Sequence, residues 1–115
     1  MTRLFAYGTL KQDGISYHKF LEHNSTREAN AVIPGLIMYD DGEYPVVKEG
    51  NGNIRAESYL IEESLLPAVD ENEDEGKDYT RKEIVSMDGR RGWIYVYNGS
   101  AEHLSPIESG TWWNL

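Results

Sequence analysis

Residues 79–97 read YTRKEIVSMDGRRGWIYVY. Both ends of this stretch are rich in β-branched and aromatic residues, which favour strands. Asp88-Gly89 lies between them, and its glycine can adopt the positive φ that a tight hairpin turn requires. We therefore predict that residues 79–87 pair with residues 93–97 in a β-hairpin.

The same turn dipeptides recur on either side of this hairpin. Asp41-Gly42, Asn51-Gly52 and Asn98-Gly99 each end a β-branched or aromatic stretch, so we predict further hairpin turns there. The remaining expected strands are residues 3–7, residues 26–39 (one strand, or two broken near Pro34-Gly35), residues 44–48 and residues 54–61.

Two short helices are expected to interrupt the strands. Ser16 can cap the first, and Ser64 can cap the second with Pro67 in its first turn. The apolar positions that these helices would bury are Tyr17, Phe20 and Leu21 in the first, and Leu65, Leu66 and Val69 in the second. The predicted fold class is α+β: a small mixed, mostly antiparallel curved sheet or barrel of about six strands with two or more short helices.

Composition limits both the domain count and the partners. The chain has 115 residues, of which 39% are hydrophobic and 27% charged, so we expect residues 1–115 to form a single domain. Its net charge of −9 would repel phosphate backbones and anionic lipids, so neither a nucleic acid nor a membrane is an expected partner. No feature of the sequence points to an oligomeric state.

Several kinds of site and segment are not expected. The sequence has no cysteine, which excludes disulfides, thiolate metal sites and cysteine nucleophiles. His18, His23 and His103 do not have the spacing of a metal site, so we expect no metal. The first residues have too few apolar side chains for a signal peptide, and no stretch approaches the ~20 apolar residues of a membrane span, so we expect a cytoplasmic protein.

An acidic run, DENEDE at residues 70–75, follows the apolar turn of the second predicted helix. Val69 and Glu73 are four residues apart and share a helical face, so Glu73 is the carboxylate drawn toward the interior. Burial and neighbouring carboxylates would raise its pKa toward the range of a general base at neutral pH. The alternative is a solvated helix end without a chemical role.

A second candidate lies where the first predicted strand ends, at Tyr7-Gly8-Thr9-Leu10. Gly8 allows a ligand to approach the backbone closely, and successive N–H groups leaving a strand can bind an anion. The alternative is a plain strand end with a β-turn. The pattern leaves both interpretations open.

Four motifs in a fixed order resemble the gamma-glutamylcyclotransferase-like superfamily. They are FAYGTLK at residues 5–11, DGEYPVV at residues 41–47, VDENE at residues 69–73 followed by Tyr79-Thr80-Arg81, and Ser109-Gly110-Thr111-Trp112. The resemblance spans nearly the whole chain. It implies a small mixed barrel flanked by helices, in agreement with the strands and helices expected above.

The resemblance also implies residue roles. The backbone N–H groups of Tyr7, Gly8, Thr9 and Leu10 would hold the substrate, with Tyr79 near the catalytic acid/base. Glu73 would be that catalytic residue, as the last position of a D-x-x-E motif counted from Asp70. In the family a glycine tends to follow the catalytic glutamate directly, and counting back from Gly76 selects Glu75 instead.

The reaction implied by the resemblance is an intramolecular aminolysis of a γ-glutamyl amine or peptide. The α-amine attacks the γ-carbonyl, which yields 5-oxoproline and a free amine or amino acid without a cofactor. The expected partner is therefore a small γ-glutamyl compound. The alternative is a non-catalytic small-molecule-binding or structural protein of the same fold.

Overall fold

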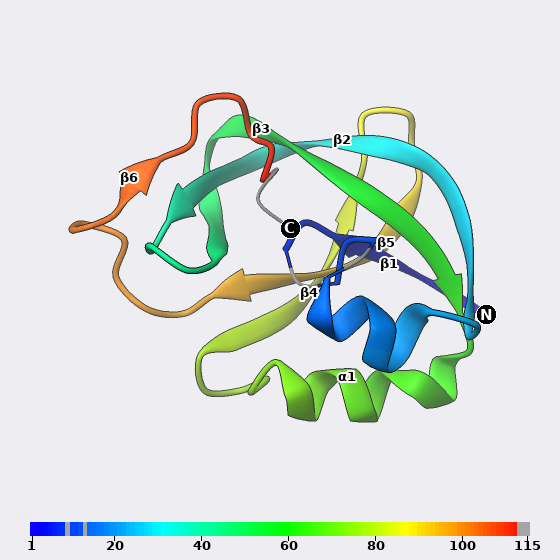
Figure 1. Cartoon of the computed structure of the whole chain (residues 1–115). Helices are drawn as coiled ribbons and strands as arrows, with labels where there is room; N and C mark the ends of the chain where they lie inside the picture. Colours follow the sequence, from blue (N-terminus) through cyan, green and yellow to red (C-terminus); the bar gives the residue numbers. More distant parts are fainter. Residues whose placement is uncertain (9, 13, 113–115) are drawn as a thin grey trace.

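A computed structural model describes residues 1–8, 10–12 and 14–112, and it contains one six-stranded, strongly curved sheet (Figure 1). The strand order is β4-β5-β1-β3-β2-β6, and every pair is antiparallel except β1 with β5. The strands are β1 (Thr2–Ala6), β2 (Ser25–Asp40), β3 (Pro45–Ile61), β4 (Tyr79–Val85), β5 (Arg91–Tyr97) and β6 (Ser105–Pro106). The predicted fold class is confirmed.

Within the residues that the structure describes, three short helical elements connect the strands. A π-helical turn, η1 (Tyr17–Leu21), precedes β2, and the 3₁₀ turn η2 (Glu63–Leu65) leads directly into the α-helix α1 (Leu66–Asn72). Pro67 lies in the first turn of α1, where its missing N–H costs little. The prediction that Ser64 caps this helix was wrong: Ser64 lies inside η2, because the Leu65 N–H already donates to the Glu62 carbonyl at 3.0 Å.

Two of the predicted hairpin turns are present. Gly42 (φ 104°) lies in the turn between β2 and β3, and Gly89 (φ 86°) lies in the turn between β4 and β5. At Asn98-Gly99 strand β5 ends without a hairpin, since the next strand, β6, pairs with β2.

The prediction of a turn at Asn51-Gly52 was wrong, because β3 runs through both residues. A Cβ atom at Gly52 would lie 2.8 Å from the Leu36 carbonyl oxygen. The partner strand β2 shifts its register at this point, between Pro34 and Leu36, and remains one strand. Gly52 therefore allows two strands to approach closely. The Asn-Gly sequence alone does not show whether its glycine has this role or forms a turn.

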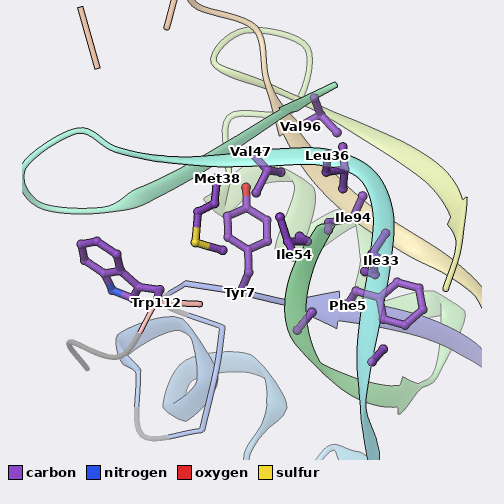
Figure 2. Packing of buried hydrophobic residues seen from close by; sticks show 12 residues of the cluster. Phe5, Tyr7, Ile33, Leu36, Met38, Val47, Ile54, Ile94, Val96 and Trp112 are labelled. Carbon is purple, nitrogen blue, oxygen red and sulfur yellow. The ribbon is translucent and has the colours of Figure 1, made fainter. Parts of the chain in front are cut away.

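The central strands are buried on both faces of the sheet. In β1 and the residue after it, Phe5 and Tyr7 point into one hydrophobic cluster and Leu4 and Ala6 into another. The first cluster fills the concave side of the sheet with Ala31, Ile33, Leu36, Met38, Val47, Ile54, Ala56, Ile94, Val96 and Trp112 (Figure 2). The second packs η1 and α1 against the other side through Leu10, Phe20, Leu21, Tyr59, Ile61, Leu66, Val69 and Tyr95.

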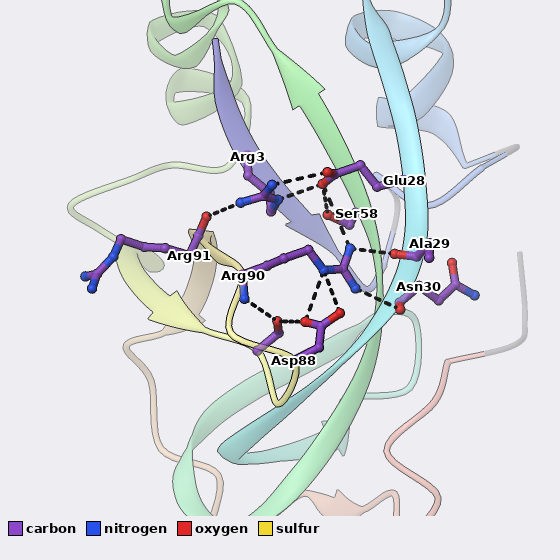
Figure 3. Close-up of polar contacts among 9 residues, drawn as sticks. Arg3, Glu28, Ala29, Asn30, Ser58, Asp88, Arg90 and Arg91 are labelled. Carbon is purple, nitrogen blue, oxygen red and sulfur yellow. Dashed lines mark hydrogen bonds and ion pairs between the residues drawn. The ribbon is translucent and has the colours of Figure 1, made fainter.

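Arginine side chains hold the far end of the β4–β5 hairpin against β2 (Figure 3). Arg90 donates to the carbonyl oxygens of Ala29 (2.7 Å) and Asn30 (3.1 Å), and Arg3 on β1 binds both carboxylate oxygens of Glu28. These contacts join strands that are not neighbours in the sheet and so maintain its curvature. Within the described ranges, no helix is long and apolar enough to cross a membrane.

Candidate functional site

A cavity of about 350 Å³ opens where β1 ends, between the end of α1 and the turn that joins β2 to β3. Its walls are mostly aromatic and apolar, and two adjacent carboxylates contribute to them. The described residues that line it are Phe5, Tyr7, Gly8, Leu10, Ile15, Ser16, Tyr44, Pro45, Asn72, Glu73, Asp74, Tyr79 and Tyr95.

Glu73 is placed in the cavity wall by the end of α1. The helix ends at Asn72, and the Glu73 N–H still donates to the Val69 carbonyl at 3.0 Å. Glu73 therefore lies on the same face as Val69, whose side chain is fully buried in the core. The carboxylate is half-buried as a consequence.

Burial changes the acidity of this group. It raises the pKa of the Glu73 carboxyl to about 7, and the neighbouring Asp74 carboxylate adds to the increase. Close to neutral pH, the side chain is thus present in both its protonated and its ionised form. A group in this state can accept a proton and return it within one reaction cycle.

Glu75 lies outside the cavity. Its side chain is exposed, and its carboxylate accepts a hydrogen bond from the Arg81 backbone N–H at 3.3 Å. Glu73 and Glu75, which the motif spacing left as alternatives, are therefore separated in space. Of these two glutamates, Glu73 alone is among the described residues that line the cavity.

A tight turn after Glu73 returns the chain to the same cavity. Asp74 (φ 50°) and Gly76 (φ 91°) both have left-handed backbone conformations, and the Gly76 N–H donates to the Tyr79 carbonyl at 2.7 Å. The turn brings the Tyr79 ring into the cavity wall. Burial, followed by the charge of Glu73, raises the pKa of Tyr79, so its hydroxyl stays protonated and can donate a hydrogen bond.

The end of β1 forms the opposite wall, with Tyr7, Gly8 and Leu10 all lining the cavity. The Tyr7 hydroxyl donates to the Tyr95 carbonyl at 2.6 Å, which ties this wall to β5. A Cβ atom at Gly8 would lie 3.1 Å from Cγ of Pro45, so the backbone here passes close to the β2–β3 turn. Thr9, the remaining residue of the predicted binding loop, lies outside the described residues.

Asp70, Arg81 and Tyr95 form a polar cluster that sequence reasoning did not find. The Asp70 carboxylate accepts hydrogen bonds from Arg81 Nε and from the Tyr95 hydroxyl, both at 2.7 Å. The Arg81 guanidinium also lies 4.3 Å from the centre of the Trp93 ring. The cluster fixes α1 against β4 and β5, and the spacing of D-x-x-E and Y-x-R was the signal that could have revealed it.

The cavity thus combines a carboxylate of nearly neutral pKa with tyrosine hydroxyls and an approachable backbone. Within the part of the chain that the structure describes, no group of three or more His, Cys, Asp or Glu side chains could hold a metal ion. The chemistry that these described residues support is proton transfer to and from a small polar molecule.

Comparison with known proteins assigns the chain to a family. Residues 4–114 match the family model described as gamma-glutamyl cyclotransferase, AIG2-like. A protein of Vibrio cholerae serotype O1, whose name includes gamma-glutamylcyclotransferase, is 36% identical over 109 residues, which cover 95% of this chain and 93% of that protein.

Two solved structures share the fold. The solution structure of the protein YtfP from Escherichia coli is 32% identical and superimposes with a TM-score of 0.77, covering 97% of this chain and 96% of that one. An uncharacterized protein of Pyrococcus horikoshii has a TM-score of 0.81 at 22% identity, covering 96% and 89% of the two chains. The chain belongs to the AIG2-like gamma-glutamyl cyclotransferase family.

Proposed function

We propose that this protein catalyses the intramolecular aminolysis of a γ-glutamyl amine or peptide. The α-amine of the γ-glutamyl group attacks the γ-carbonyl carbon, and the bond from that carbon to the leaving nitrogen breaks. The products are 5-oxoproline and a free amine or amino acid. Membership of the family supports the reaction class, and the geometry of the cavity supports the roles proposed for the residues.

Glu73 acts as the proton carrier in this proposal. The substrate's α-amine is protonated at neutral pH and becomes nucleophilic only when a base removes that proton. Ionised Glu73 accepts the proton and then returns it to the leaving nitrogen. The observation that carries the proposal is a half-buried carboxylate of pKa about 7 in the wall of a cavity.

The remaining lining residues bind and orient the substrate. The backbone at Gly8 and Leu10 supplies N–H donors for the substrate and for the oxyanion that develops at the γ-carbonyl. Tyr79 stands beside Glu73 with a protonated hydroxyl that can orient the bound molecule. Tyr7 closes the wall behind the loop through its bond to the Tyr95 carbonyl.

The direct test is a panel of γ-glutamyl amines and γ-glutamyl dipeptides incubated with the purified protein. Release of 5-oxoproline together with the free amine, in equal amounts, supports the reaction. Binding without release favours the non-catalytic alternative. A panel in which no compound binds or reacts contradicts the proposal.

The pH dependence of kcat/KM should show Glu73 directly. Because the base must be ionised, activity is expected to fall as pH drops through the pKa of Glu73 in the free enzyme, with a midpoint near 7. A series of initial rates from about pH 3.5 to about pH 9 measures this midpoint. A midpoint close to 4.5, the ordinary pKa of a glutamate side chain, would indicate an exposed group instead.

Gly8→Val is expected to leave the fold intact and to weaken binding of a γ-glutamyl ligand about tenfold or more. A side chain at this position starts 3.1 Å from Pro45 Cγ, and its branches would enter the cavity or displace Pro45. Gly8→Ala adds a single carbon and should have a smaller effect. Calorimetric titration of both variants measures the affinity. If Gly8→Val binds the ligand as tightly as the wild type, the segment is a plain turn without a role in binding.

A further inference from the structure

Glu57 is a buried carboxylate that the proposed chemistry does not use. It lies on β3 with its side chain 11% exposed, on the side of the sheet that packs against η1 and α1. It is not among the described residues that line the cavity. A buried carboxylate is costly unless its oxygens are bonded, so its partners indicate its role.

Those partners include the segment that carries Gly8 and Leu10. One Glu57 oxygen, Oε1, accepts the backbone N–H of Gln12 at 2.5 Å and the Tyr59 hydroxyl at 2.7 Å. The other, Oε2, lies 3.2 Å from the Arg27 guanidinium. Arg27 also donates to the Gln12 side-chain oxygen, so both the backbone and the side chain of Gln12 are held from β2 and β3.

Other contacts also hold this segment in place. The Lys11 N–H donates to the Gly8 carbonyl at 2.9 Å, which links Gly8 to the residue that precedes Gln12. Lys11 Nζ donates to the Trp112 carbonyl, and Leu10 is buried among the side chains under η1 and α1. Among the described residues, the Gln12–Glu57 bond joins the backbone of this segment to a charged group on the sheet.

We propose that Glu57 is a positioning residue that holds the cavity wall at Gly8 and Leu10 through the Gln12 N–H. The inference rests on the proposed function only for its kinetic consequence. Backbone donors accelerate a reaction when they are fixed at the developing charge before it forms. Glu57 supplies that fixation from the side of the segment that faces away from the substrate.

Glu57→Met tests the proposal, because methionine keeps the volume of the side chain and removes the acceptor. Amide hydrogen exchange around Gln12 is expected to accelerate by about tenfold or more. In active protein, kcat/KM should fall ~10–10²-fold while the pH midpoint near 7 stays in place, since Glu73 is untouched. Glu57→Gln retains an oxygen that accepts the Gln12 N–H and should restore both properties.

Glu28→Met is the matched control. Glu28 is also a partly buried carboxylate, with Arg3 and the Ser58 hydroxyl as partners (Figure 3), and none of these three is among the described residues that line the cavity. Ser58 follows Glu57 on β3 and therefore faces the opposite side of the sheet. Glu28→Met is expected to lower stability without changing exchange around Gln12 or kcat/KM.

The outcomes separate this inference from the proposed reaction. Unchanged exchange in Glu57→Met, or an equal loss of kcat/KM in Glu28→Met, overturns the positioning role even if the wild type is active. Faster exchange without any change in kcat/KM also overturns it. If the wild type releases no 5-oxoproline, the reaction fails, and the exchange comparison alone decides whether Glu57 holds the segment. Should Glu57→Met not fold, an unprotected Gln12 amide in the wild type overturns the inference.

Discussion

Replacing Glu73 by glutamine is expected to lower the rate of 5-oxoproline release by ~10²–10⁴-fold. Glutamine has nearly the same shape and length, but its amide cannot take the proton of the substrate's ammonium group. The ligand should still bind, because the cavity walls are unchanged. The measurement is kcat on a compound that the substrate panel identifies, with binding followed separately by calorimetry.

Glu75→Gln is the matched control for this variant. It makes the same chemical change two residues away, on a side chain that is exposed and outside the cavity. Its rate should stay close to that of the wild type. Reversed effects would assign the base to Glu75, and wild-type rates in both variants would remove the carboxylate mechanism.

Stability provides an independent check on Glu73→Gln. The pKa of Glu73 in the folded protein, about 7, exceeds its value of 4.5 in the unfolded reference, so the folded state binds more protons between these values. The free energy of unfolding should therefore decrease as pH rises through this window. Above pH 7 the glutamine variant should be more stable than the wild type, by on the order of 1–3 kcal/mol, which denaturant titration measures. A less stable variant would show that the carboxylate contributes to the fold.

Gly110→Ala is expected to destabilise the protein by roughly 2–5 kcal/mol. Gly110 has a φ of 68°, and a Cβ atom there would lie 2.4 Å from the Asn53 carbonyl oxygen on β3. The Gly110 carbonyl accepts the Arg55 N–H at 2.7 Å, so the backbone cannot move away without losing this bond. The following segment places Trp112 in the concave core. Denaturant unfolding followed by tryptophan fluorescence measures the change.

Two causes contribute to the destabilisation expected for Gly110→Ala: the backbone strain of a positive φ and the close contact with the Asn53 carbonyl oxygen. Gly89→Ala separates them. Gly89 also has a positive φ, 86°, but nothing lies within 4 Å of a Cβ atom built there. Its substitution should cost only the backbone strain of about 1–2 kcal/mol. Equal effects at both positions would show that the contact with Asn53 contributes nothing.

Local sequence patterns were sufficient for much of the fold. The β4–β5 hairpin across Asp88-Gly89 and the turn at Asp41-Gly42 were predicted because a glycine between two strand-forming stretches satisfies a local backbone requirement. Asn51-Gly52 has the same pattern but lies inside β3. There the glycine allows β2 to pass close to β3 at Leu36. Such a contact between residues distant in sequence cannot be predicted from the dipeptide alone.

The candidate site also has one part that local sequence patterns predicted and one part that depends on tertiary packing. The helical spacing of Val69 and Glu73 placed Glu73 on the buried face, because that relation is set within one turn of helix. The opposite wall of the cavity comes from residues that only the packing of β1 against β3 and of η1 against the sheet brings close: Tyr7, Gly8, Leu10, Ile15, Ser16, Tyr44 and Pro45.

By itself, the sequence determined the α+β class, the main hairpins and the helical face that carries Glu73, since each depends on periodicity or turn chemistry within a few residues. Tertiary structure alone decided that Glu75 is exposed, that Asp70 is held by Arg81 and Tyr95, and that Glu57 reaches Gln12. Burial and long-range hydrogen bonds depend on how distant segments pack, and packing also raises the pKa of Glu73 to about 7.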